Sequence, residues 1–237
     1  MVGLGKMGRE VEAVLRERNH EPAIVLRDQT FPTHCQVGID FTRAEAVVSN
    51  VQAALRSGAR YVVGTTGWSD HEAEVRTLVD KNQGGFVHGA NFSVGVGLFY
   101  EIVRHAAGLM APFPEYDPYI LEKHHRAKRD APSGTAKELS HIVRDAGGAR
   151  TKALSRFEGP LPDGSFAVSS VRAGGIVGEH TVGFDSGGDE ILLEHRARSR
   201  RGFALGAVLA AEWISTRQGY FAFSDVIQSL VAQGEVR

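Results

Sequence analysis

The segment Leu121–Ala136 gathers proton donors, cations and a turn that could hold an anion within a short stretch of chain. Histidine is the side chain whose ordinary pKa lies nearest neutrality, so His124 or His125 could supply a proton to a reacting carbon. Ser133–Thr135 opens a predicted helix, and the first N–H groups and the dipole of a helix favour a bound carboxylate or phosphate. The segment is typical of an active site for a small anion.

His124 is the residue that we predict to donate the proton. Residues four apart share a side of a strand or a helix, so His124 and Lys128 are expected on one side, whereas His125 faces elsewhere in an extended segment. No cysteine or third well-spaced ligand stands beside the two histidines, so we predict no metal. The basic run could instead hold nucleic-acid phosphates, but it lacks aromatic side chains that stack on bases.

The pattern Gly3-x-Gly5-x-x-Gly8 has the spacing of a dinucleotide-binding turn, in which glycines permit close approach to a pyrophosphate. Asp28 follows at the end of a predicted strand, where its carboxylate could bind a ribose hydroxyl, and Arg27 offers a cation for a 2′-phosphate. Only two residues precede the turn, although a full strand is expected there. An ordinary glycine turn, with Arg27 a solvated charge, is the alternative interpretation.

The elements that must position these residues change in style along the chain. The first part alternates predicted strands (22–26, 37–41, 61–63 and 86–87) with predicted helices (one led by the glycine turn, 44–57 and 72–81). Such alternation indicates a parallel sheet covered on both faces. From about Asp117 the pattern is α+β, with strands at 119–121, 166–172, 180–184 and 190–198 and a helix at 135–146. Helices return at 204–214 and, capped by Ser224, up to residue 230.

Two short segments follow predicted strands of the parallel sheet, where ligands of open α/β sheets bind. Gly64–Gly67 comes after the strand 61–63, and Ala90–Ser93 comes after the strand 86–87. Both segments therefore lie where a ligand of such a sheet is expected. Thr42 and Asn91 could also serve as ordinary caps of the helices that follow them.

Composition narrows the classes of function. The net charge of −1 gives no general argument for a nucleic-acid or membrane partner, so anion binding must be local. The single cysteine, Cys35, cannot form an intramolecular disulfide, which fits a reducing cytoplasm, and we interpret it as a small apolar residue. The apolar stretch 203–211 is far short of the ~20 residues of a membrane span, and a turn stands where a signal peptide would carry its apolar core.

The sequence resembles the dihydrodipicolinate reductase family, nicotinamide-dependent reductases of bacterial lysine and diaminopimelate synthesis. The family signature of a glutamate, two histidines, a lysine and D-A-P-S-G-T-A is matched by Glu122, His124, His125, Lys128 and Asp130–Ala136. Further similarity lies in the segments 3–8, 39–42, 64–67, 90–96 and 171–181. The resemblance therefore extends over nearly the whole chain.

The resemblance implies an α/β fold in which a Rossmann-type dinucleotide-binding domain (1–92 and 204–237) carries an inserted α+β substrate and oligomerisation domain (93–203). It implies catalytic roles for His124 and Lys128, with a substrate site made of His125, Ser133, Gly134 and Thr135. The implied cofactor site comprises Gly3, Leu4, Gly5, Lys6, Met7, Gly8, Arg27, Asp28, Gly64, Thr65, Thr66, Ala90, Asn91, Phe92 and Ser93. A cytoplasmic homotetramer that uses NADPH, NADH or both to reduce an anionic cyclic dicarboxylate is expected.

Several side chains receive other interpretations. Asp130 is expected to orient Lys128 or the turn. Three arginines, Arg196, Arg198 and Arg200, would share one face of a strand and either contact substrate or face solvent or another subunit. Four aromatic residues are predicted to lie in the core: Phe157, Trp213, Tyr220 and Phe221. Alternative functions are a related amino- or imino-dicarboxylate dehydrogenase, similar to aspartate dehydrogenase, and a non-catalytic nucleotide sensor.

Overall fold

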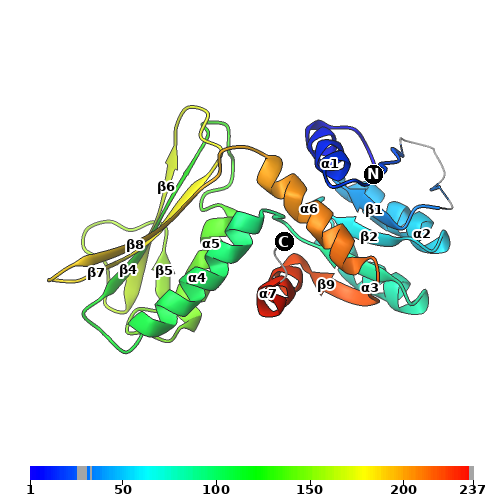
Figure 1. Cartoon of the computed structure of the whole chain (residues 1–237). Helices are drawn as coiled ribbons and strands as arrows, with labels where there is room; N and C mark the ends of the chain where they lie inside the picture. Colours follow the sequence, from blue (N-terminus) through cyan, green and yellow to red (C-terminus); the bar gives the residue numbers. More distant parts are fainter. Residues whose placement is uncertain (26–30, 33, 235–237) are drawn as a thin grey trace. The chain divides into compact units, whose positions relative to one another are not determined.

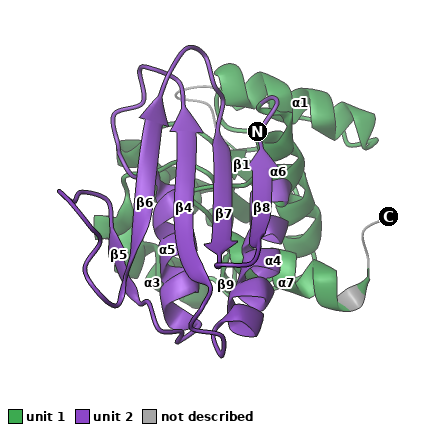
Figure 2. Cartoon of the chain, turned by 90° about the vertical axis from the view of Figure 1, so that its left-hand side faces the viewer, with its two compact units in different colours: residues 1–94, 200–237 green, residues 95–199 purple. Residues whose placement is uncertain are grey.

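The chain forms two compact units in a computed structural model that describes residues 1–25, 31–32 and 34–234 (Figures 1 and 2). One unit comprises residues 1–94 and 200–237, and the other comprises residues 95–199. The sequence placed the division after residues 92 and 203. The assignment of cofactor to the first unit and substrate to the second stays a prediction.

The first unit is built on a parallel four-stranded sheet, which confirms the predicted α/β class. The strand order is β1 (Val37–Asp40), β2 (Arg60–Val63), β3 (Gly85–His88) and β9 (Gly219–Ala222). The helices are α1 (Lys6–Glu17), α2 (Val47–Arg56), α3 (Glu72–Lys81), α6 (Arg201–Ile214) and α7 (Phe223–Gln233), with short 3₁₀ turns at Ala44–Ala46 and Ser69–His71. Among the described residues, these helices pack against both faces of the sheet.

Alternation along β2 shows how the sequence builds two cores. Val62 points into a cluster with side chains from α1, α6 and α7, whereas Tyr61 and Val63 point into a cluster with side chains from α2 and α3. A parallel strand that is buried on both faces is expected to be apolar there, as the buried residues 61–63 of β2 are. The side-chain period of two therefore divides one apolar run between two cores.

The predicted strand 22–26 forms only a minimal contact. Val25 makes an isolated bridge with Val2, its N–H donates to the Met1 carbonyl at 2.8 Å, and Leu26 lies outside the described residues. Val2 also bridges Asp40 and donates to the Ile39 carbonyl at 2.9 Å. Among the described residues, Val25 therefore contributes one bridge rather than a strand.

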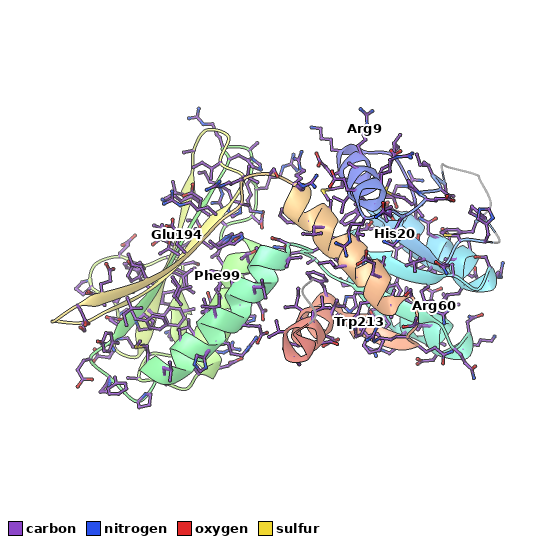
Figure 3. All side chains as sticks on the ribbon, in the orientation of Figure 1. Arg9, His20, Arg60, Phe99, Glu194 and Trp213 are labelled. Carbon is purple, nitrogen blue, oxygen red and sulfur yellow. The ribbon has the colours of Figure 1, made fainter. Side chains whose placement is uncertain are left out.

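The second unit is a five-stranded mixed sheet with two helices behind it (Figure 2). The strand order is β5 (Lys152–Leu154), β6 (Ser165–Arg172), β4 (Asp117–His124), β7 (Glu179–Asp185) and β8 (Glu190–Arg196), and the helices are α4 (Val94–Met110) and α5 (Gly134–Asp145). Every second residue of β4 is buried. The inner face packs on both helices through Ile120, Val182, Phe99 and Leu139, and Phe99 of α4 is labelled in Figure 3.

Several sequence predictions are wrong in this structure. Strand β8 ends at Arg196, so Arg198 and Arg200 lie beyond it and the three arginines do not share a strand. Phe157 is 46% exposed rather than core, whereas Trp213, Tyr220 and Phe221 are partly buried against the two cores of the first unit. Helix α7 begins before Ser224, since Asp225 accepts a hydrogen bond from the Ala222 N–H at 2.8 Å. None of the described helices is long and apolar enough to cross a membrane.

A buried carboxylate at the end of β1 organises the loops of the first unit. Asp40 is fully buried and accepts hydrogen bonds from the Thr42 N–H at 2.7 Å and the Thr65 hydroxyl at 3.3 Å. Asn50 and Tyr61 donate to its other oxygen at 2.9 and 3.1 Å. Asp40 thereby ties the loop after β1 to the loop after β2.

Replacing Asp40 by asparagine removes the charge and turns one acceptor oxygen into a donor, so at least one of these donors loses a good partner. We expect urea unfolding of Asp40→Asn to show a loss of about 1–3 kcal/mol in the free energy of unfolding. Asp225→Asn is the matched control, because its carboxylate accepts from an exposed helix-end N–H and its loss should stay below about 1 kcal/mol. Equal losses would contradict the role given to Asp40.

Candidate active site

Strand β4 carries Glu122 and His124 on its buried inner face, two residues apart. The Glu122 side chain is 0% exposed and that of His124 is 10% exposed. A hydrogen bond joins the His124 Nδ1 to the Glu122 Oε2. The acid predicted from the sequence therefore stands against a buried carboxylate.

Glu122 is held by further donors from other elements. Arg172 of β6 donates from Nη2 to the Glu122 Oε1 at 2.7 Å, and the Ser133 N–H donates to the same oxygen at 3.2 Å. Burial raises the pKa of the Glu122 carboxyl, but hydrogen bonds from Arg172 and Ser170 and the charge of His124 outweigh it and leave that pKa below its ordinary value. The carboxylate is therefore ionised at neutral pH.

A second buried histidine, His180 of β7, lies beside His124. The two ring centroids are 5.1 Å apart in an edge-to-face arrangement, and the His180 Nε2 lies 3.2 Å from the Ser133 hydroxyl. Burial, followed by the charge of His124, lowers the pKa of His180 to about 4. His180 is thus a neutral neighbour of His124 at physiological pH.

Lys128 lies near His124, but not through the strand or helix periodicity from which the sequence argument predicted it. The chain turns directly after β4, and the Lys128 N–H donates to the His125 carbonyl at 3.1 Å, so the periodicity argument for a shared side does not apply. The Lys128 Nζ is paired with Asp130 at 2.8 Å, as expected of Asp130, while His125 is exposed. Burial lowers the pKa of His124, Glu122 raises it, and the charges of Lys128 and Arg172 add to the net lowering.

Helix α5 begins at the predicted anion-binding turn. The Ser133 hydroxyl caps it by accepting from the Ala136 N–H at 3.2 Å, and no acidic side chain lies in its first turn. Gly134 is exposed, with open space where a Cβ would stand. Thr135 is half-buried and hydrogen-bonds through its side chain to Tyr100 of α4. Ser133 is therefore a cap that also contacts Glu122 and His180, and Gly134 is the member of the turn most open to a ligand.

The glycine turn before α1 separates into structural and open positions. Gly3 has φ +77°, and a Cβ on Gly8 would come within 2.7 Å of the Gly3 carbonyl oxygen. Gly5 has an ordinary extended backbone and nothing within 4 Å of a Cβ, and Leu4 and Lys6 are exposed beside it. Met7 is partly buried against the core. The fold requires Gly3 and Gly8, whereas open space at Gly5 leaves room for a pyrophosphate at the uncapped start of α1.

The other predicted cofactor residues of the first unit lie at strand ends. Thr66 is exposed, Thr65 is held by Asp40, and Gly64 packs against the Phe41 ring. Arg27 and Asp28 lie outside the described residues.

In the segment that follows β3, Ala90 is exposed and Phe92 is buried in the core. The Asn91 Oδ1 accepts from the Ser93 N–H at 2.9 Å, which forms a local turn. The alternative that Thr42 caps the next helix is wrong, because Arg43 occupies the cap position of that 3₁₀ turn.

The sequence argument that no third ligand stands near His124 is wrong. Among the described residues, Glu122, His124 and His180 offer ligand-capable atoms that lie within 4.8 Å of one another. Arg172 already occupies one oxygen of Glu122, and the positive charges of Arg172 and Lys128 oppose a divalent cation there. A site without a metal stays our prediction.

Sequence reasoning gave no role to three residues of this cluster, which are Glu122, Arg172 and His180. The rule that residues two apart share a strand face, applied to Glu122 and His124, would have found the first. Arg172 and His180 come from other strands, where His124 pairs with Arg172 and Glu122 pairs with His180. That register cannot be read from local sequence.

His180 makes stability depend on pH. The unfolded chain takes up a proton near pH 6.5 and folded His180 near pH 4, so the unfolded state binds more protons between these values and stability falls as pH falls through this window. The expected loss is about 3 kcal/mol between pH 7 and pH 4. In urea unfolding at these two pH values, His180→Gln should show a smaller loss than wild type, while exposed His141→Gln should not. An unchanged slope in His180→Gln would contradict this account.

Comparison with known proteins points to one family along the chain. A family profile described as "Dihydrodipicolinate reductase, N-terminus" matches residues 6–92, and one described as "Dihydrodipicolinate reductase, C-terminus" matches residues 95–227. A 4-hydroxy-tetrahydrodipicolinate reductase of Christiangramia forsetii is 34% identical, covering 97% of each chain. One of Archaeoglobus fulgidus is 37% identical, covering 96% of this chain and 84% of that protein.

Solved structures show the same fold. A dipicolinate-bound dihydrodipicolinate reductase from Paenisporosarcina sp. has a TM-score of 0.71 at 22% identity, covering 94% of this chain and 97% of that chain. An amine dehydrogenase from Mycobacterium smegmatis has a TM-score of 0.59 at 10% identity, with 94% of each chain covered. The two profile matches and the two sequence relatives span nearly the whole chain, and on their evidence this protein belongs to the dihydrodipicolinate reductase family.

Proposed function

We propose that the protein reduces the cyclic dicarboxylate formed from 4-hydroxy-tetrahydrodipicolinate to tetrahydrodipicolinate, with a nicotinamide dinucleotide as hydride donor, in lysine and diaminopimelate biosynthesis. The observation that carries the proposal is the acid His124, braced by Glu122, in the same cluster as the capped start of α5. Reduction of an unsaturated ring needs an acid for the carbanion-like carbon and a grip on the carboxylates. Family membership supplies the substrate class.

The residues of the second unit divide this work. His124 donates the proton, and Lys128 is the second catalytic cation, held by Asp130 until substrate arrives. Gly134 and Thr135 bind a substrate carboxylate at the start of α5, with Ser133 as the cap, and the exposed His125 is a further substrate contact. A dianionic substrate beside His124 favours the protonated ring and so offsets the lowering that burial imposes on its pKa.

The residues of the first unit fit a nicotinamide dinucleotide. The open Gly5 and the uncapped N-terminus of α1 suit the pyrophosphate, and the exposed Thr66 and Ala90 stand at strand ends where the rest of the cofactor is expected. When bound, the cofactor supplies the hydride. Arg27 and Asp28 together support use of both NADPH and NADH, because a cation suits a 2′-phosphate and a carboxylate suits a 2′-hydroxyl.

The related dehydrogenase and the sensor remain the competing functions. A non-catalytic sensor has no need of a proton donor that a carboxylate holds in place. In this protein the buried Glu122 is hydrogen-bonded to His124. A cytoplasmic homotetramer completes the proposal, on the grounds of family membership and the single cysteine.

The glycine turn provides a test of the cofactor site. Gly5→Val should fold, since the backbone there is extended and the space is open, but its side chain should block the pyrophosphate. We expect at least about tenfold weaker NAD(P)H binding, or ~1.4 kcal/mol, by cofactor fluorescence titration. Gly108→Val is the control, because Gly108 lies on α4 and also has open space where a Cβ would stand. Gly147 is unsuitable for this purpose, since its positive φ would strain any side chain. Unchanged affinity in folded Gly5→Val would remove the turn from the site.

The acid provides a test of the reaction. Nicotinamide absorbance should decay when freshly generated cyclic substrate is added, with NADH and NADPH assayed in parallel. His124→Gln keeps a hydrogen-bonding side chain but cannot supply the proton, so we expect turnover about 100-fold lower with cofactor affinity nearly unchanged. His141→Gln, on the exposed side of α5, should retain turnover. If wild type oxidises neither cofactor, the proposed function fails, and if His124→Gln keeps most turnover, the acid lies elsewhere.

A further inference from the structure

The Glu122 carboxylate determines which nitrogen of His124 carries a hydrogen in the neutral ring. Its Oε1 accepts from Arg172 and from the Ser133 N–H, and its Oε2 faces the His124 Nδ1. An ionised carboxylate has only acceptor sites. The Nδ1 of His124 must therefore bear the hydrogen of this bond.

The opposite edge of the His124 ring faces Gly178. A Cβ on Gly178 would stand 3.1 Å from the His124 Nε2 and 3.4 Å from its Cδ2, so the absence of a side chain at this position leaves room beside Nε2. Turning the ring over would place a carbon against the carboxylate and lose the hydrogen bond to Glu122. The bond and the open space thus assign the two nitrogens to different tasks.

We propose that Glu122 is a positioning residue that holds His124 with its hydrogen on Nδ1, so that Nε2, on the side left open by Gly178, delivers the proton. This inference rests on the proposed function, in which His124 is the acid. During reduction the Nε2–H bond of the imidazolium breaks and a C–H bond forms at the carbanion-like carbon. The ring is left neutral with its hydrogen on Nδ1, still bonded to Glu122, and solvent returns a proton to Nε2.

The charged and titratable groups around His124 leave this task to Glu122. Arg172 from β6 and Lys128 from the segment after β4 both oppose a positive ring, and His180 from β7 presents a neutral ring at neutral pH. Among the described groups that act on His124, Glu122 is the one that favours the imidazolium. It therefore determines both the hydrogen position and the ease of recharging.

In Glu122→Gln the neighbouring donors fix the orientation of the new amide. Arg172 and the Ser133 N–H both need an acceptor, so the amide oxygen takes the place of Oε1 and the NH₂ group faces His124. The His124 Nδ1 must then accept, which moves the hydrogen of the neutral ring to Nε2. An imidazolium would bring two donors together.

The experiment is ¹⁵N NMR of histidine-labelled protein, with the His124 signals identified by their loss in His124→Gln, together with turnover at several pH values. We expect wild type to show Nδ1–H, and Glu122→Gln to show Nε2–H with turnover about 100-fold lower and cofactor affinity unchanged. The limb on which kcat falls with rising pH should move to lower pH in Glu122→Gln. Glu179→Gln is the control, since Glu179 lies on β7 beside β4 but its carboxylate accepts from Lys123 at 3.3 Å. This variant should keep the wild-type tautomer and turnover.

Two results would overturn the inference: an Nε2–H tautomer in wild type, or an unchanged tautomer and turnover in Glu122→Gln. The wild-type spectrum decides the question even if Glu122→Gln does not fold. Failure of the proposed function has a different signature, because His124→Gln would then retain turnover, or no substrate would be reduced, whatever the tautomer of His124.

Discussion

The second unit is arranged around one buried negative charge. A carboxylate removed from water costs several kcal/mol unless donors replace its hydration, and Glu122 receives them from β4, β6 and the start of α5. Each donor ties Glu122 to a different feature: His124 is the proposed acid, Arg172 belongs to β6, and the Ser133 N–H lies at the start of α5. A shift of any one element would leave a buried charge without a partner. The chemistry and the local fold therefore have the same physical requirement.

The first unit follows the same plan with Asp40. Both carboxylates lie at or near the carboxyl end of a strand, are fully buried, and accept from backbone N–H groups as well as side chains. In each unit the buried carboxylate holds a loop whose neighbouring residues, Thr66 in one and Gly134 in the other, are exposed. Rigid interior charges thus support solvent-facing positions where a ligand can bind.

Local patterns predicted what depends on local physics. The alternation of apolar runs identified β1, β2, β3 and α3, and the predicted helix 135–146 begins within one residue of the start of α5. Helix α4 was missed because its first turns, with Gly95 and Gly97 among β-branched residues, have poor helix propensity and are stabilised by packing of Phe99 and Val103 on the sheet. The strand register that brings Arg172 and His180 to Glu122 is a long-range property. The motif therefore located the proposed acid, whereas the residues that hold it could be found only from the fold.

The glycines of the two motifs differ in whether the fold requires them. Gly3 and Gly8 have structural reasons to lack a side chain, namely a positive φ and a close approach to a carbonyl. Gly5 and Gly134 have neither, and both stand at the N-terminus of a helix with open space around them. Propensity for glycine at such a position is modest. A small residue that the fold does not need, beside N–H groups that favour an anion, fits the ligand sites proposed here. The same reasoning applies separately to each unit, and it supports a pyrophosphate at Gly5 and a carboxylate at Gly134.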